Sequence, residues 1–138
     1  MLLPAKTKYR KSFRRRGGFK GTASRGARLA YGAFGLKALS CGELSSRQLE
    51  AARRAMTRYL KRGGKVWIRV FPDRPITRKA AEVPMGSGKG ALEKYVAIVK
   101  PGRIIFEMDG ISLKDAKQAL KLAAYKLPVQ CTVVSNIN

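Results

Sequence analysis

The first 42 residues carry eleven Lys or Arg side chains and no acidic residue, because the first acid in the chain is Glu43. Such a segment cannot balance its own charge with internal ion pairs. Its first 28 residues also include four glycines and show neither a helical nor a strand period. We therefore predict an extended basic tail over residues 1–28, followed by one folded domain over residues 29–138.

The whole chain of 138 residues has a formal net charge of +22 and a pI of about 10.9. Self-repulsion of that size implies a polyanionic partner, such as nucleic acid with its phosphates. A hydrophobic share of 45% still allows one buried core. The ten cations before residue 29 have no acid to pair with, so we expect the tail to bind RNA phosphates. The tail candidates are Lys6, Lys8, Arg10, Lys11, Arg14, Arg15, Arg16 and Lys20.

A helix is predicted from Ser45 to Gly63. Ser45 can act as the N-cap, Gln48 completes a capping box three residues later, and Leu44 can pack on Leu49 as a hydrophobic staple. At 100° per residue one face is apolar, while the opposite face carries only cations. Such a row is either a solvated helix face or a phosphate-binding surface, and the absence of an acid within it favours phosphate binding. The apolar face comprises Leu49, Ala52, Met56, Tyr59 and Leu60, and the cationic row comprises Arg47, Arg54, Arg58 and Lys61.

The remaining elements predict an α+β fold. Strands are expected over residues 65–71 and 129–134, with a short one near 76–79, and one or two over 29–39, interrupted at Gly32 and Gly35. Residues 95–99 and 104–108 are expected to pair as a hairpin, because a Pro-Gly turn joins them. Ser112 and Asp115 begin a second helix that Pro128 ends. Its expected buried stripe is Leu113, Ala116, Leu120, Ala123, Ala124 and Leu127. We predict a mixed or antiparallel sheet packed against two helices.

Few groups in the chain could perform chemistry at neutral pH. There is no histidine, and the eight carboxylates lie singly or in pairs, of which Glu107 and Asp109 are the closest. This pair is expected to be structural or solvated. Cys41 and Cys131 are far apart and lack the spacing of a zinc site or a redox motif. We therefore expect no catalytic residue, no metal site and no cofactor.

A glycine-rich loop spans Met85, Gly86, Ser87, Gly88, Lys89 and Gly90. We aligned the Gly-Lys pair of this loop with that of a nucleotide-binding P-loop. A P-loop would then have glycine at position 83 and a hydroxyl residue at position 90, but the chain has Val83 and Gly90. We expect a mobile basic loop that presents Lys89 and backbone N–H groups to a nucleic-acid backbone.

Three aromatic residues, Tyr9, Phe13 and Phe19, alternate with the cations of the tail. They could stack on unpaired bases, or they could hold the tail against its own domain or its neighbours, and the sequence leaves both roles open. Two isolated cysteines favour a reducing compartment. No apolar run approaches the roughly 20 residues needed to cross a bilayer, and Lys6 interrupts the start too early for a signal peptide, so we expect a soluble protein.

The sequence closely resembles the bacterial type of large-subunit ribosomal protein sixteen. The matching stretches are MLLPAKTKYRK at 1–11, FGLKA at 34–38, SRQLEAARRAMTR at 46–58, KVWIRVFPD at 65–73, MGSGKG at 85–90, KPGR at 100–103 and KLP at 126–128. These stretches cover nearly the whole chain in order. The resemblance implies an α+β structural protein at the base of the central protuberance of the large ribosomal subunit, which joins late in assembly.

The resemblance also implies partners. They are 23S-type rRNA, with 5S rRNA as a further candidate, A-site and P-site tRNA, and neighbouring large-subunit proteins, with no membrane and no small-molecule substrate. By the same resemblance the basic tail would thread into rRNA, and the loop at 85–90 would face tRNA. The expected location is the ribosome, in bacterial cytoplasm or an organelle matrix. Many relatives carry Arg where Pro84 stands and Lys where Ser87 stands, so this loop is less basic and cannot take the arginine hydroxylation known in some bacteria.

Two other classes of function remain to be tested against this one. An RNA-modifying or phosphoryl-transfer enzyme would depend on Lys89 and a carboxylate, and a free-standing RNA-binding regulator would act away from the ribosome. The sequence does not distinguish a bacterial from an organellar ribosome. Nor does it show the rRNA helices contacted, any base-specific contact, or a role for the cysteines.

Overall fold

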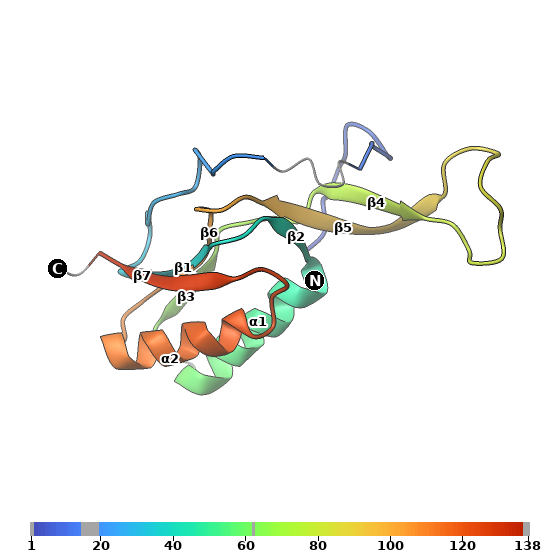
Figure 1. Ribbon diagram of the computed structural model, residues 1–138. Helices are drawn as coiled ribbons and strands as arrows, with labels where there is room; N and C mark the ends of the chain where they lie inside the picture. The colour runs from blue at the N-terminus through green and yellow to red at the C-terminus, as the bar shows by residue number, and fades with distance from the viewer. Residues whose placement is uncertain (1, 15–19, 62, 137–138) are drawn as a thin grey trace.

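The computed structural model describes residues 2–14, 20–61 and 63–136. In these ranges the chain forms two helices and two β-sheets, so the predicted α+β class is confirmed (Figure 1). In chain order the elements are β1 (Phe34–Ala38), β2 (Gly42–Ser45), α1 (Ser46–Leu60), β3 (Lys65–Ile68), β4 (Arg74–Arg78), β5 (Ala91–Val99), β6 (Ile104–Asp109), α2 (Leu113–Ala124) and β7 (Cys131–Ser135).

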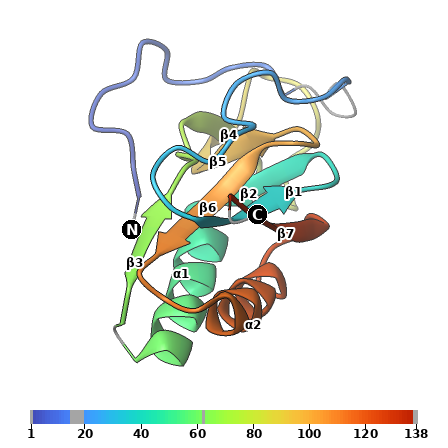
Figure 2. The same cartoon turned by 90° about the vertical axis from the view of Figure 1, so that its left-hand side faces the viewer.

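The strands form two sheets, where the sequence predicted one. The larger sheet has the order β3-β6-β1-β7 and the smaller has the order β2-β5-β4, and every neighbouring pair is antiparallel. Helices α1 and α2 pack side by side on one face of the larger sheet, as Figure 2 shows. The β4–β5 hairpin reaches away from this body and carries a long loop at its end (Figure 1).

The predicted hairpin between residues 95–99 and 104–108 is wrong. Strand β5 pairs with β2 and β4, whereas β6 pairs with β1 and β3 in the other sheet. The turn exists, since the Arg103 N–H donates to the Lys100 carbonyl at 3.1 Å, but it leads the chain from one sheet into the other. Both strands are central and so need a partner on each side. Their partners come from distant parts of the sequence, which an apolar pattern does not reveal.

Several strand boundaries also differ from the prediction. Strand β3 ends at Ile68, although the Arg69 N–H still donates to the Ile105 carbonyl at 2.8 Å. Gly35 does not interrupt a strand but lies buried inside β1, and β2 was not predicted. The strand near 76–79 is present as β4, and the last strand as β7, each displaced by one or two residues. Displacements of this size are common at strand ends.

The start of α1 is confirmed in detail. The Ser45 hydroxyl accepts a hydrogen bond from the Gln48 N–H at 3.2 Å, and the Gln48 side chain accepts one from the Ser45 N–H at 3.0 Å. Both members of the predicted staple, Leu44 and Leu49, are fully buried. The helix ends earlier than predicted, because Lys61 takes a left-handed conformation with φ of 50° and closes the last turn.

The core lies between the helices and the larger sheet. From α1 it takes Leu49, Ala52 and Met56. The cap of α2 is also as predicted, with the Ser112 hydroxyl accepting from the Asp115 N–H at 3.3 Å. Its buried stripe includes Ala116, Ala119, Leu120 and Ala123, but Leu113 at its start is 42% exposed, contrary to expectation.

One carboxylate, Glu107 in the middle of β6, is fully buried. One of its oxygens accepts hydrogen bonds from the N–H groups of Ala30, Tyr31 and Gly32, at 2.8, 3.0 and 3.2 Å. The other accepts from the Arg69 guanidinium at 2.5 Å. Burial alone would raise the pKa of Glu107, but the hydrogen bonds to the ionised form outweigh it, so the pKa lies below its usual value. Glu107 thereby fixes the segment before β1 to the larger sheet.

Glu107→Gln should destabilise the protein strongly. An amide can still accept from the backbone N–H groups, but it no longer balances the charge of Arg69, whose side chain is only 17% exposed. We expect the free energy of unfolding to fall by about 3 kcal/mol in urea denaturation. Asp109→Asn on the same strand is the control, since Asp109 is exposed and should change stability little. Equal losses for both variants would contradict this role of Glu107.

The stabilisation by Glu107 should depend on pH. Its folded-state pKa lies below 4.5, the value for the unfolded chain, so the unfolded chain binds the proton first as the pH falls. The contribution is complete above about pH 4.5 and is lost below it, as the pH falls through the folded-state pKa. The stability difference between the parent and Glu107→Gln should therefore shrink as the pH falls below about 4.5. A difference that stays constant over this range would show that Glu107 does not titrate as described.

Candidate nucleic-acid interface

The described tail residues, 2–14 and 20–28, contain no helix or strand. Most of this segment runs along the side of the sheets that faces away from the helices, in blue in Figure 1. Among the predicted phosphate-binding residues, Lys11 is half-buried, and Arg15 and Arg16 lie outside the described residues, as does Phe19. The exposed members are Lys6, Lys8, Arg10, Arg14 and Lys20. Five predicted phosphate-binding residues of the tail are thus exposed, on a segment whose backbone runs mostly along one side of the sheets.

The C-terminal part of the tail is held against the turn between β5 and β6. The Ala23 N–H donates to the Pro101 carbonyl, and the Ile104 N–H donates to the Gly26 carbonyl, both at 2.8 Å. These bonds continue the hydrogen bonding of a sheet without forming a strand. The tail therefore reaches β1 along a defined path over the domain.

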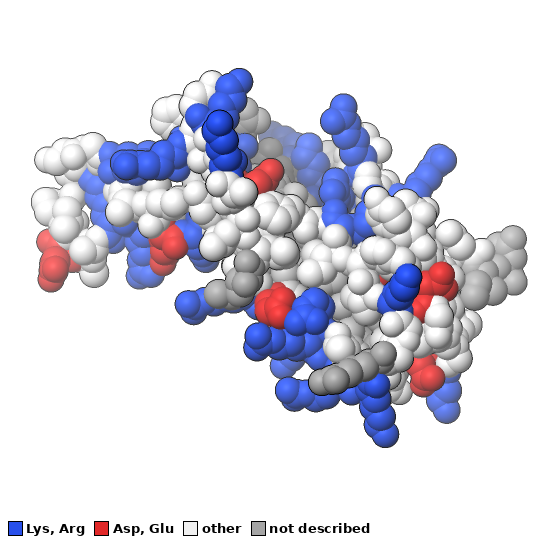
Figure 3. Space-filling view, turned by 180° about the vertical axis from the view of Figure 1, so that it is seen from behind, with Lys and Arg blue, Asp and Glu red and all other residues white. Residues whose placement is uncertain are grey.

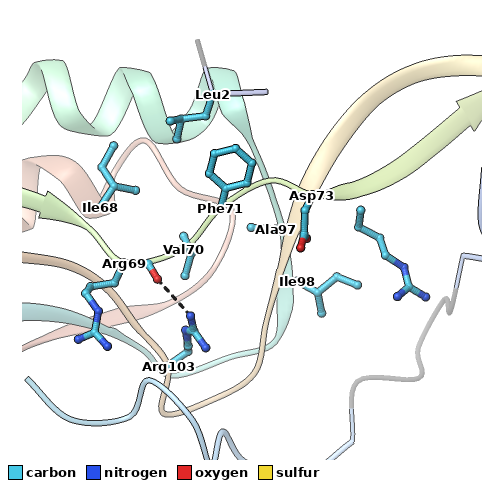
Figure 4. Close-up of a pocket in the computed structure, with 10 residues that line it drawn as sticks. Leu2, Ile68, Arg69, Val70, Phe71, Asp73, Ala97, Ile98 and Arg103 are labelled. Atoms are coloured by element: carbon cyan, nitrogen blue, oxygen red, sulfur yellow. Dashed lines mark hydrogen bonds between the residues drawn. The ribbon is translucent and has the colours of Figure 1, made fainter. Parts of the chain in front are cut away.

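Arg103 binds the tail with its side chain. Its guanidinium donates to the Arg25 carbonyl at 3.3 Å and to the Arg69 carbonyl at 3.1 Å, the second bond being drawn in Figure 4. It lines a hollow of about 480 Å³, which Leu2 and Phe71 also line. Leu2 packs against the core, so the described start of the tail is bound to the domain as well. Both Leu2 and Arg103, which line this hollow, thus help to attach the tail to the domain.

Arg14 corrects the expectation that the tail cations have no acid to pair with. Its guanidinium lies 2.8 Å from the carboxylate of Glu43, the first acid in the chain. The tail folds back over β2, which brings these two residues together. With 40% of the Arg14 side chain exposed, the pair is worth about 1 kcal/mol or less and can exchange for a phosphate.

The cationic row of α1 is exposed at all four positions, Arg47, Arg54, Arg58 and Lys61. It is less uniform than the sequence suggested, because Glu50 pairs with Arg53 at 2.5 Å and with Arg54 at 3.3 Å. The hydrogen bond from Arg53, followed by both nearby charges, lowers the pKa of Glu50. Helical spacing places Glu50 one turn before Arg54, so an i,i+4 pair was to be expected.

The α1 row and the tail form two separate basic surfaces. The helices lie on one side of the sheets, and most of the described tail lies on the other, in both ribbon views (Figures 1 and 2). On the face seen in Figure 3, Lys and Arg side chains spread over the whole molecule with isolated acids between them.

The glycine-rich loop lies at the far end of the β4–β5 hairpin. Residues 79–90 contain no helix or strand, as predicted for residues 84–90, and Met85 is 97% exposed. Gly86, Ser87 and Gly88 all have positive φ, at 113°, 60° and 95°. A left-handed serine is uncommon and costs of order 1 kcal/mol, so only the two glycines suit this conformation.

The structure brings this loop and the tail together. The Lys11 ammonium donates to the Lys89 carbonyl at 3.4 Å, and the Lys89 ammonium lies 5.6 Å from the centre of the Phe13 ring. Two groups that the sequence singled out separately thus form one surface. The α1 row is not part of it.

Sequence reasoning missed Arg69, Arg74 and Arg103, which attach the tail to the domain. A usable signal existed for Arg69, because it interrupts an apolar strand just as Glu107 interrupts another. Charged residues in buried strands are seldom tolerated unless they pair with each other. Arg103 follows a turn, where a basic residue carries no such signal.

Within the described parts of the chain, no group of three or more His, Cys, Asp or Glu residues could hold a metal ion. No helix in those ranges is long and apolar enough to cross a membrane.

Gly26→Ala should loosen the tail. An added Cβ would lie 2.7 Å from the Arg103 guanidinium and would displace it from its bonds to Arg25 and Arg69. We expect faster amide exchange at Ala23 and Ile104. We also expect about 1 kcal/mol more loss of stability than in a control at another glycine of the tail with a left-handed φ.

Gly21→Ala is the matched control. Gly21 also has a left-handed φ, at 88°, but nothing lies within 4 Å of its added Cβ. Amide exchange that increases equally in both variants would show that the contact with Arg103 does not hold the tail.

The comparisons with known proteins agree with the resemblance seen in the sequence. The family model of ribosomal protein L16p/L10e matches residues 4–134. The large ribosomal subunit protein uL16 of Nitrobacter hamburgensis is 58% identical over 137 residues, which are 99% of this chain and 98% of that protein. The chain therefore belongs to the ribosomal protein L16p/L10e family.

Proposed function

We propose that this protein is a structural component of the large ribosomal subunit that binds 23S-type rRNA mainly through phosphates. The observation that carries this proposal is the pair of exposed basic surfaces on a member of a ribosomal protein family. The chain has a net charge of +22, and five ion-pair contacts form among the residues that the structure describes, so most of its cations are available for phosphates. Two surfaces on opposite sides of the sheets suit a protein packed between rRNA segments.

The tail and the α1 row have different parts in this proposal. The tail would follow the rRNA backbone along one side, and the α1 row would contact a second segment on the other side. Such contacts position the protein without reading sequence. A contact to 5S rRNA and contacts to neighbouring large-subunit proteins belong to the same proposal, as does a role late in subunit assembly.

The loop at residues 85–90 would face tRNA in the A and P sites. Its support is its place at the end of a projecting hairpin, its exposed backbone and Lys89. Pro84 and Ser87 make it less basic than in many relatives, so it would contribute fewer charge contacts. In this proposal the protein positions RNA and performs no catalysis, and its location is the ribosome, of a bacterium or an organelle.

Binding to large-subunit rRNA should depend steeply on salt. If six to ten phosphates are contacted, affinity falls by about 10³- to 10⁵-fold between about 50 and 200 mM salt. Replacing Arg47, Arg58 and Lys61 by Gln should reduce the slope of log affinity against log salt by about 3. Filter binding across a salt series measures this slope.

The matched control replaces three exposed cations of α2, Lys114, Lys117 and Lys121, by Gln. If the α1 row binds phosphates and this face does not, only the α1 variant changes the slope. A salt-independent affinity of the parent protein would refute phosphate binding.

Cosedimentation tests the location, since a free-standing regulator would stay in the soluble fraction while a subunit protein travels with large subunits.

A further inference from the structure

Two adjoining hollows lie where the tail passes β4 and the base of the glycine-rich loop. The smaller, of about 340 Å³, is lined by tail residues from Pro4 to Ser12 and by residues 73–75. The larger, of about 470 Å³, is bounded by Phe13 and Lys89. Both are lined by Tyr9, Ser12 and Arg74, so they form one continuous depression.

The larger hollow exposes aromatic rings. The Phe13 side chain is 87% exposed and Tyr9 is 69% exposed. The backbone at Phe13 is nevertheless held, because the Arg74 guanidinium donates to its carbonyl at 3.3 Å. The Lys89 ammonium lies near the Phe13 ring, and the Lys8 ammonium lies 5.7 Å from the centre of the Tyr9 ring. A ring that packed the tail onto its own domain would be covered, and Phe13 is not.

Two residues that line the smaller hollow each have a buried polar atom without a partner. The Ser12 hydroxyl and the Arg74 Nε are buried, and neither has a hydrogen-bond partner among the described residues. Buried donors of this kind normally have partners in a complete complex. Lys6 and Lys8 line the same hollow, together with one acid, Asp73. Because cations outnumber the single acid, this hollow suits an anionic group such as a phosphate.

We propose that this depression, Tyr9–Phe13 with Arg74 and Lys89, binds one unpaired RNA nucleotide. Its base stacks on the open face of the Phe13 ring, and its phosphate lies near Lys6 and Lys8, the cations that line the smaller hollow. Single-stranded nucleotides are bound in this way by aromatic platforms next to cations. The inference rests on the proposed RNA-binding function and adds a base contact to it. Either rRNA or tRNA can supply the nucleotide, because the site lies between the tail and the loop.

The first test compares two short single-stranded RNAs of equal length and charge, one normal and one abasic, for binding to the full chain. The normal RNA should bind about 5- to 150-fold more tightly, as expected for one stacked base. Phe13→Ala should reduce this preference to near one, and Phe13→Tyr should keep it. Phe13 is exposed, so neither change threatens the fold.

Tyr125→Ala is the matched control, since Tyr125 is an exposed aromatic residue, 68% accessible, that follows α2 on the helix side. It should leave the base preference unchanged. An equal affinity of the parent for normal and abasic RNA would refute the nucleotide site, and so would a preference that survives Phe13→Ala. Salt-dependent binding to both RNAs would then still support the phosphate contacts, whereas absence of binding to either RNA and to large-subunit rRNA would refute the proposed function itself.

The second test identifies the source of the nucleotide. Large subunits are assembled with the parent or the Phe13→Ala protein, and nucleotide reactivity is probed chemically in rRNA and in bound tRNA. An unpaired nucleotide that is protected by the parent and exposed by Phe13→Ala supports the site and identifies its RNA. Identical reactivity of both RNAs in the two kinds of subunit would overturn the proposal.

Discussion

The buried ion pair between Glu107 and Arg69 is the interaction on which the arrangement of the tail and sheets depends. A carboxylate in the middle of a sheet is costly to desolvate unless every lone pair finds a donor. Here three backbone N–H groups and one guanidinium meet that need. Those N–H groups precede β1, and Arg69 follows β3. The Glu107 carboxylate therefore joins both of these segments to β6.

From this pair a series of contacts leads outward to the tail. The Arg69 carbonyl accepts from Arg103, which also donates to Arg25, and the Arg69 guanidinium lies 5.3 Å from the centre of the Tyr31 ring. Tyr31 in turn stacks on Trp67, with ring centres 6.0 Å apart. Charged groups therefore attach this segment to the domain, whereas apolar packing holds the helices on the larger sheet. A chain with so many arginines can use some of them as structural connectors and leave the rest for RNA.

Local features of the fold were predictable and distant pairings were not. The capping box at Ser45 and the cap at Ser112 depend on residues within one helical turn, so the sequence shows them directly. The pairing of β5 with β2 and β4 depends on residues far apart, and a turn at Gly102 looks the same whether it joins a hairpin or two sheets. For the candidate site, the tail and the loop could be predicted as basic segments. Their meeting at Phe13 and Lys89 could not, because it requires the fold.

The two basic surfaces also bear on the folding equilibrium of the protein. Cations with few acidic partners repel one another more strongly in the compact state than in the expanded chain, and a bound polyanion removes that repulsion. Any polyanion that prefers the folded state also stabilises it by mass action, in proportion to the logarithm of its concentration over its dissociation constant. If RNA binds as proposed, it would also stabilise the folded chain, and the protein would be most stable in the environment where it acts.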